Sequence, residues 1–151
     1  MTHSGRIGLK RSSSLKRVRL VRPLFDRSRS DVKTVSAGCV RIIYRPVDHG
    51  TLVGRNAVQT VFVVSRRVGS AVVRNRTRRI MRDTFSRVLP YLSEATLSTG
   101  RSLTTAVIFR GTASDDRVQI VADLRVALSV LIARLGSGEA HHQTLERISG
   151  S

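Results

Sequence analysis

One uninterrupted segment, Ala71 to Tyr91, constrains the fold more than any other part of the sequence. It contains no glycine, and its only proline, Pro90, stands next to its end; Gly69-Ser70 before it supplies a break and a residue that can cap a helix. The segment therefore predicts one long helix. At about 100° per residue, apolar and small residues share one face and arginines share another. The first face holds Val73, Thr77, Ile80, Met81, Thr84 and Val88, and the second holds Arg74, Asn75, Arg78, Arg79 and Arg82.

The arginine face carries a charge that the segment does not neutralise. Arginines spaced four residues apart along it repel their neighbours by about 0.2–0.5 kcal/mol per pair. From Arg66 to Arg87 there are eight arginines and one acid, Asp83, whereas a solvated helix face usually mixes both signs. We interpret the face as a nucleic-acid contact. Charge alone does not separate RNA from DNA.

The whole chain is strongly basic, with 27 Lys and Arg against 10 Asp and Glu, a formal net charge of +17 over 151 residues. Such a charge attracts polyanions. A basic helix on a membrane surface would need aromatic anchors, but there is no Trp and only 4 Phe. The apolar runs are too short to span a bilayer. Most of the basic residues are Arg, which suits bidentate phosphate contacts, although a GC-rich coding sequence would produce the same bias.

The sequence offers little for disulfide, metal or catalytic chemistry. Cys39 is the only cysteine, which excludes an internal disulfide and a zinc site built on Cys pairs, and suits a reducing compartment. His141 and His142 are adjacent, point apart on any regular element and make a poor metal pair. No paired acids and no Ser/His/Asp set can be assembled around the basic helix. We therefore expect no catalytic residue, no metal site and no disulfide-linked partner in this chain.

The flanking segments predict an α+β domain with one small sheet. Runs of β-branched and apolar residues predict strands at residues 39–44, 58–64 and 104–110. The first two read most simply as a hairpin with a long loop, in which Asp48-His49-Gly50 and Gly54-Arg55-Asn56 are turn material.

Two further helices are predicted. A short one spans residues 23–31, where Pro23 can open a turn. After a loop at residues 97–102 and the predicted third strand, Ser114-Asp115-Asp116 supply a cap and first-turn acids for a last helix that ends at Gly136. We expect this helix to bury Ile120, Leu124, Ala127, Leu128, Leu131 and Leu135.

The chain divides into three parts by composition. Residues 1–19 form a basic, Ser-rich arm that we expect to be flexible, and an organelle transit peptide is the alternative. Residues 20–136 form the folded domain, which carries the basic helix. Residues 137–151 have the composition of a disordered tail.

The segment from Phe62 to Phe85 resembles the signature of the bacterial ribonuclease P protein subunit. The matching parts are a strand that ends in Ser65-Arg66-Arg67, the turn Gly69-Ser70-Ala71-Val72, the core Arg74-Asn75-Arg76, and Arg78-Arg79 followed by Ile80-Met81-Arg82. The order of elements on either side also agrees.

The resemblance implies a small two-layer α/β sandwich, similar to domain 2 of ribosomal protein S5. It would have a mixed sheet of about four strands and a long basic helix in a left-handed crossover. The implied function is that of the protein subunit of ribonuclease P, a bacterial-type, cytoplasmic ribonucleoprotein. The subunit would bind the catalytic RNase P RNA and the 5′ leader of precursor tRNA, and would assist the endonucleolytic removal of the leader. The catalytic centre and most of the Mg²⁺ would belong to the RNA, and no membrane is involved.

Residue by residue, the resemblance implies a set of side chains that face RNA: Arg66, Arg67, Arg74, Asn75, Arg76, Arg78, Arg79 and Arg82. Aromatic residues of the family line a cleft for the single-stranded leader, and the counterparts here are Phe25 and Tyr44. For both, a place in the core is the alternative. The sequence departs from the family at Ser70, where an amide is usual, and in the first helix at Val21 and Pro23.

Two other classes of protein share the basic helix. A structural RNA-binding protein of the ribosomal type would use it to brace folded RNA. A DNA-binding helix module is less favoured, because no short turn and partner helix precede the long helix to present it to the major groove.

Overall fold

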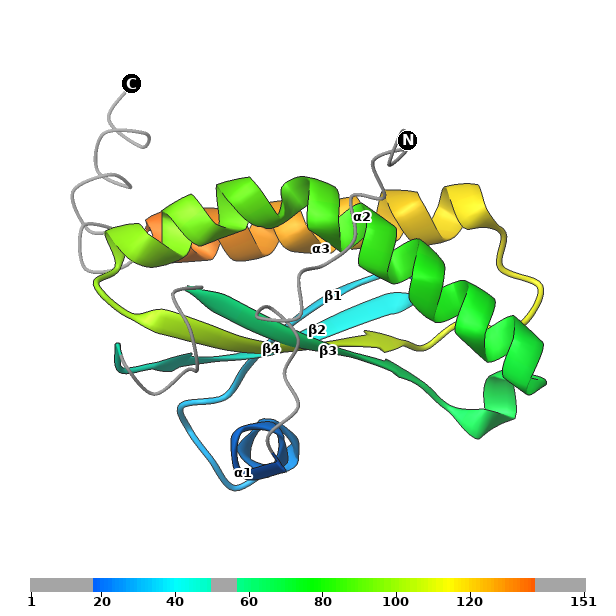
Figure 1. The fold of residues 1–151 in the computed structure, drawn as a ribbon, viewed down its shortest axis with the longest axis horizontal. Coiled ribbons are helices and arrows are strands. Elements are labelled where there is room, and N and C mark those ends of the chain that lie inside the picture. The colour runs from blue at the N-terminus through cyan, green and yellow to red at the C-terminus, as the bar shows by residue number, and fades with distance from the viewer. Residues whose placement is uncertain (1–17, 50–56, 138–151) are drawn as a thin grey trace, which may run out of the picture.

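The computed structural model describes residues 18–49 and 57–137. Its elements in chain order are α1 (Val18–Val21), the 3₁₀ turn η2 (Arg22–Phe25), β1 (Lys33–Ala37), β2 (Val40–Val47), β3 (Val58–Val64), the 3₁₀ turn η3 (Arg66–Val68), α2 (Ala71–Ser98), β4 (Ser102–Phe109) and α3 (Arg117–Gly136) (Figure 1). Most of the predicted arm and tail, the pair His141 and His142, and the predicted turns at Gly50 and at 54–56 lie outside the described residues.

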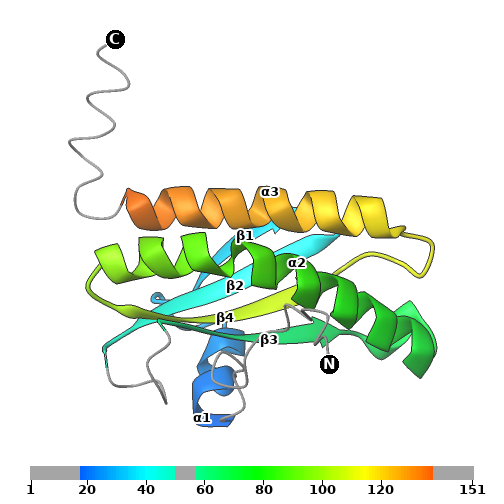
Figure 2. The same cartoon turned by 45° about the horizontal axis from the view of Figure 1, so that its top comes forward.

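The four strands form one sheet in the order β1-β2-β4-β3. β2 is antiparallel to both of its neighbours, and β3 and β4 are parallel. α2 and α3 lie side by side on one face of this sheet, and α1 with η2 lies on the other (Figures 1 and 2). The predicted α+β fold with a mixed sheet is confirmed.

The connection from β3 through α2 to β4 is left-handed. With the helices toward the viewer and both strands pointing up, β4 lies to the left of β3 (Figures 1 and 2). Crossovers between parallel strands are right-handed in almost all sheets. This one places α2 over the edge strand β3, and α3 packs over β1 and β2.

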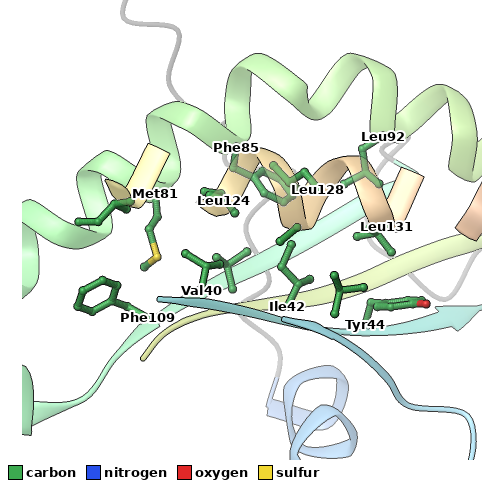
Figure 3. Packing of buried hydrophobic residues seen from close by; sticks show 14 of the residues in the cluster. Val40, Ile42, Tyr44, Met81, Phe85, Leu92, Phe109, Leu124, Leu128 and Leu131 are labelled. Atoms are coloured by element: carbon green, nitrogen blue, oxygen red, sulfur yellow. The ribbon is translucent and has the colours of Figure 1, made fainter. Parts of the chain in front are cut away.

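The main core lies between the sheet and the two long helices. Alternation along β2 sends Val40, Ile42 and Tyr44 toward the helices, where they meet Phe85 and Leu128 (Figure 3). All five side chains are buried. Each large apolar side chain buried in this way contributes about 1.5–3 kcal/mol.

A second, smaller cluster holds α1 and η2 against the opposite face of the sheet. Leu20 and Leu24 pack there with Ile43, Val47 and Ala106. This cluster fixes the only helical segment that the described residues place on that face.

The predicted faces of the long helices are confirmed. On α2, Thr77, Ile80, Met81 and Thr84 are buried, and Val73 and Val88 are half-buried. On α3, all of the predicted core residues are buried except Leu135, which is half-buried. The predicted cap at Ser70 is confirmed, because its hydroxyl accepts from the Val73 amide at 3.3 Å. At α3 the cap is Asp116, whose carboxylate accepts from the Gln119 amide at 2.8 Å, so the predicted acids do not stand in the first turn of the helix.

α2 is longer than predicted. It continues through Pro90 to Ser98, so the loop predicted from residue 97 begins only after the helix ends. Pro90 cannot donate to the carbonyl of Ser86. However, the next turns bury Leu92 and Thr96 almost completely, and this packing offsets the missing hydrogen bond.

Two other predictions are wrong. The strands at 40–47 and 58–64 do not form a hairpin, because β4 lies between them. The partner of β2 in a hairpin is instead β1, a strand that was not predicted, joined to it through Gly38 and Cys39. The helix predicted at 23–31 is also wrong: helical structure begins at Val18 and ends at Phe25.

Candidate nucleic-acid interface

The N-terminus of α2 is built to attract an anion. Ser70 caps the helix, and no acidic residue stands in its first turn. Arg66 and Arg67 are exposed on η3, the turn just before it, which is capped by the Ser65 hydroxyl. Free backbone N–H groups and the helix dipole favour negative charge at such an end. The sequence thus places two cations beside a positive helix terminus.

Arg78 and Asn75 hold each other on the exposed side of α2. The Arg78 Nη1 donates to the Asn75 Oδ1 at 3.0 Å. This contact uses the amide oxygen and leaves the amide N–H₂ group as a donor. The donors of this pair suit phosphate oxygens.

Arg82 is held by an aromatic ring of the sheet. Its guanidinium lies 5.8 Å from the centroid of the Phe62 ring, within the range of a cation–π contact. Phe62 in turn meets Phe85 edge to face, with centroids 5.6 Å apart. The contact fixes Arg82 on the β3 side of α2. Phe62 was not predicted to support the site, although its place in the alternating pattern of β3 gave it a face shared with the helix.

The remaining members of the predicted set differ in exposure. Arg76 and Arg79 are exposed, and Arg74 is half-buried. The Nε of Arg74 is buried and has no hydrogen-bond partner among the described residues. A buried donor without a partner costs about 1–3 kcal/mol, so a bound acceptor would be favourable there.

None of these arginines is neutralised by the described part of the chain. The ion pairs that it contains lie elsewhere and join Arg29 and Arg45 to Asp31, and Arg101 to Asp48. Asp83 is the one acid among the arginines of this segment, and it makes no ion pair with a described residue. The surface formed by the eight predicted residues therefore keeps its positive charge.

The two predicted cleft aromatics lie in different environments. Phe25 ends η2 and is 46% exposed, so its ring is open to a partner. Tyr44 is only 3% exposed and points into the core beneath α2 and α3 (Figure 3). The prediction that Tyr44 lines a cleft is wrong: its position in β2 puts it on the helix-covered face, where a base cannot reach the ring.

Arg41 is a residue that sequence reasoning missed. It alternates with Val40 and Ile42 and so lies on the sheet face that carries α1 and η2. It is half-buried, and its Nε has no partner among the described residues. The signal in the sequence was an arginine inside the otherwise apolar run of residues 39–44.

The described residues contain no group of three or more His, Cys, Asp or Glu side chains that could hold a metal ion. Within the same residues, no helix is both long and apolar enough to cross a membrane.

The family model and the solved structures that match this chain agree with each other. A family model described as Ribonuclease P matches residues 9–136. No curated protein matches the sequence.

Several solved structures share the fold. The RNase P protein of Staphylococcus aureus superimposes with a TM-score of 0.56 at 17% identity, over 82% of this chain and 92% of that one. A mutant of that protein with defective mRNA degradation activity gives 0.58 at 16% identity, over 79% and 87%. The RNase P protein of Thermotoga maritima gives 0.56 at 19% identity, over 78% and 96%.

Proposed function

Because the chain belongs to the Ribonuclease P family, we propose that it binds the catalytic RNA of ribonuclease P and the 5′ leader of precursor tRNA. In this role it assists the cut that produces the mature 5′ end of the tRNA. Membership of the family makes RNase P RNA its partner and an endoribonuclease complex its setting. The contacts with RNA and the place of the catalytic centre are what we propose here.

One observation carries the proposal: the arginines around the start of α2 have no ion-pair partner among the described residues, while the helix terminus beside them is itself positive. Two RNA molecules that meet at a cleavage site repel each other through their phosphates. Arginines between them reduce that repulsion and release counterions. The protein thereby raises affinity for the precursor and lowers the Mg²⁺ concentration that the reaction needs.

We assign the leader to the face of the sheet that carries η2. Phe25 offers an exposed ring on which an unpaired base can stack. Arg41, with its unpartnered Nε, lies on the same face and supplies a donor for a phosphate. Tyr44 takes no part, because it is buried on the other face.

The catalytic Mg²⁺ is assigned to the RNA. Mg²⁺ is held by oxygen ligands, chiefly carboxylates and phosphates, and the basic segment offers a single carboxylate, Asp83. The donors of this surface therefore suit phosphates and not the metal. The part of this chain is to bind and orient the two RNAs while the RNA-bound metal supplies the hydrolytic chemistry.

The proposal is tested by cleavage of a leader-bearing precursor tRNA by a bacterial-type RNase P RNA at limiting Mg²⁺. The protein should stimulate cleavage at the mature 5′ end. Stimulation should be lost when Arg74, Arg78 and Arg82 are changed together to Gln. In a matched control, Arg29, Arg101 and Arg134 are changed together to Gln, which removes the same amount of charge. The guanidinium groups of these three arginines donate to oxygens of the protein itself.

Absence of stimulation, with salt-sensitive binding to folded RNA retained, would instead support a structural RNA-binding protein of the ribosomal type. The two candidates also differ in their preference for substrate. Only the leader-binding protein should bind precursor tRNA more tightly than mature tRNA.

A further inference from the structure

A groove between α2 and α3 lies outside the surface assigned above. It encloses about 430 Å³, with Asp83, Thr84 and Arg87 contributed by α2, and Arg117, Val118, Val121, Ala122 and Arg125 by α3. Three of these side chains are arginines and one is an acid, so its lining is positive. The two helices that form it lie side by side on the face of the sheet away from η2 (Figure 2).

The groove lies on a different side of α2 from Arg82. Arg82 lies toward β3, where it covers Phe62. Arg87 follows it by five residues, which is a rotation of about 140° around the helix, and it faces α3 across the groove. One helix thus presents arginines on two separate sides.

The arginines of the groove have no partners among the described residues. Asp83 lines the same groove, yet neither it nor Arg87, Arg117 or Arg125 takes part in the ion pairs of the described chain. Three arginines against one acid leave this concave site with an excess of positive charge, which a bound anion would neutralise.

The spacing favours an extended anion. Arg117 and Arg125 are eight residues apart on α3, which is about 12 Å along the helix axis. Arg87 lies across from them on α2. Three guanidinium groups distributed over such a length suit successive phosphates of a backbone, and the planar fork of each group suits phosphate oxygens.

We propose that this groove binds a segment of RNA backbone, at a second site distinct from the surface at the start of α2. The inference rests on the proposed function only in that the chain binds RNA. In the assembled particle the second site would let the protein hold RNA both at the start of α2 and in the groove that α2 forms with α3.

The first experiment measures how affinity for a bacterial-type RNase P RNA depends on salt. The variant carries Arg87→Gln, Arg117→Gln and Arg125→Gln together; all three side chains are exposed, so circular dichroism should show an unchanged fold. Three lost phosphate contacts should lower the slope of log affinity against log salt by about 2. The variant at Arg74, Arg78 and Arg82 is measured in parallel.

The second experiment locates the RNA without changing any charge. Val118 lines the groove and is 76% exposed, whereas Val126 is 55% exposed on the same helix but does not line it. V118C and V126C are each labelled with a thiol-linked photocrosslinker, while the buried Cys39 stays unlabelled. RNase P RNA should crosslink to the label at 118 and not to the label at 126.

An unchanged salt slope together with no crosslink at 118 would overturn the second site. The proposed function would survive that result as long as the variant at Arg74, Arg78 and Arg82 loses affinity, and it would fail if that variant binds normally. A polyglutamate peptide that binds the wild-type protein but not the groove variant, with the RNA slope unchanged, would also overturn the proposal and assign the groove to an acidic protein.

Discussion

The backbone amide of Cys39 donates a hydrogen bond of 2.9 Å to the Oδ2 of Asp123, which joins the β1–β2 turn to α3 across 84 residues of sequence. The other carboxylate oxygen accepts from the Gln119 side chain at 2.8 Å. Asp123→Ala removes the carboxylate that accepts from the Cys39 amide. This substitution should lower the free energy of unfolding by about 1–2 kcal/mol. Urea denaturation at pH 7 measures the loss, and an unchanged midpoint would contradict it.

The same contact makes stability depend on pH. The bond from the Cys39 amide, followed by that from Gln119, lowers the pKa of Asp123 below its ordinary value of 3.8. A carboxylate with a lowered pKa stabilises the fold above its unfolded pKa and loses that contribution as pH falls through the folded one. Asp123→Asn should therefore show a smaller loss of stability below pH 4 than the wild type, measured by urea denaturation across that range.

The thiol of Cys39 should be unreactive in the folded protein. Burial, followed by the nearby Asp123 carboxylate, raises the pKa of this thiol from 9.0 to about 12. Because the thiolate is the reacting form, a disulfide reagent at pH 8 should modify Cys39 slowly and react fully once urea unfolds the chain. Equal rates in the folded and unfolded states would show that the turn is open.

Gly38 should not tolerate a side chain. Its φ of +52° lies in the left-handed region, and a Cβ there would stand 2.1 Å from the Oδ2 of Asp123. Gly38→Ala should cost about 1–2 kcal/mol for the backbone, with a similar further loss because Asp123 must leave Cys39. Gly100→Ala is the control, since Gly100 has a φ of +73° but open space around it. In an Asp123→Ala background the excess cost at Gly38 should disappear.

Phe25 and Tyr44 should respond in opposite ways to alanine. Phe25→Ala removes an exposed ring and should leave stability within about 0.5 kcal/mol, but it should weaken binding of leader-bearing tRNA by about 1–3 kcal/mol for the lost stacking. Tyr44→Ala opens the core and should cost about 3–5 kcal/mol of stability. Mature tRNA is the control ligand for Phe25→Ala, and an equal loss of affinity for it would refute leader stacking.

Arg78 should count as one phosphate contact. Arg78→Ala is expected to reduce the slope of log affinity against log salt by about 0.7 for a single-stranded leader. It also frees the Asn75 oxygen that Arg78 now binds. Arg101→Ala, which removes an arginine paired with Asp48, should leave the slope unchanged. A slope that Arg78→Ala does not alter would remove this residue from the interface.

The helices whose apolar residues repeat at helical spacing could be predicted from the sequence, but the pairing of the strands could not. Thr77, Ile80 and Met81 mark the buried face of α2 through local spacing alone. The position of β4 between β2 and β3 depends on contacts such as Val58 with Leu103, which no local pattern encodes. β1 was missed because its sequence, Lys-Thr-Val-Ser-Ala, contributes only Val35 and half-buried Ala37 to the core.

The charge of the candidate site could be predicted from the sequence, but the residues that surround and position its arginines could not. The arginines of α2 follow from the sequence, since they repeat at helical spacing. The ring of Phe62 beneath Arg82 comes from β3, and the place of Tyr44 in the core depends on which face of the sheet the helices cover. Either face was compatible with the alternation of β2, so the sequence left the cleft role of Tyr44 open.

The central place of β4 also sets the order in which the molecule can assemble. β3 pairs with no other strand of the described sheet. Val58 can pair with Leu103 only after Leu103 has been synthesised, 45 residues later. During synthesis on a ribosome, α2 therefore emerges before the strand to which it crosses, and the sheet closes only after Phe109 has been added. Sheets that depend on such distant pairs form slowly, so the nascent chain carries its arginine-rich helix for a time without the scaffold that later holds it.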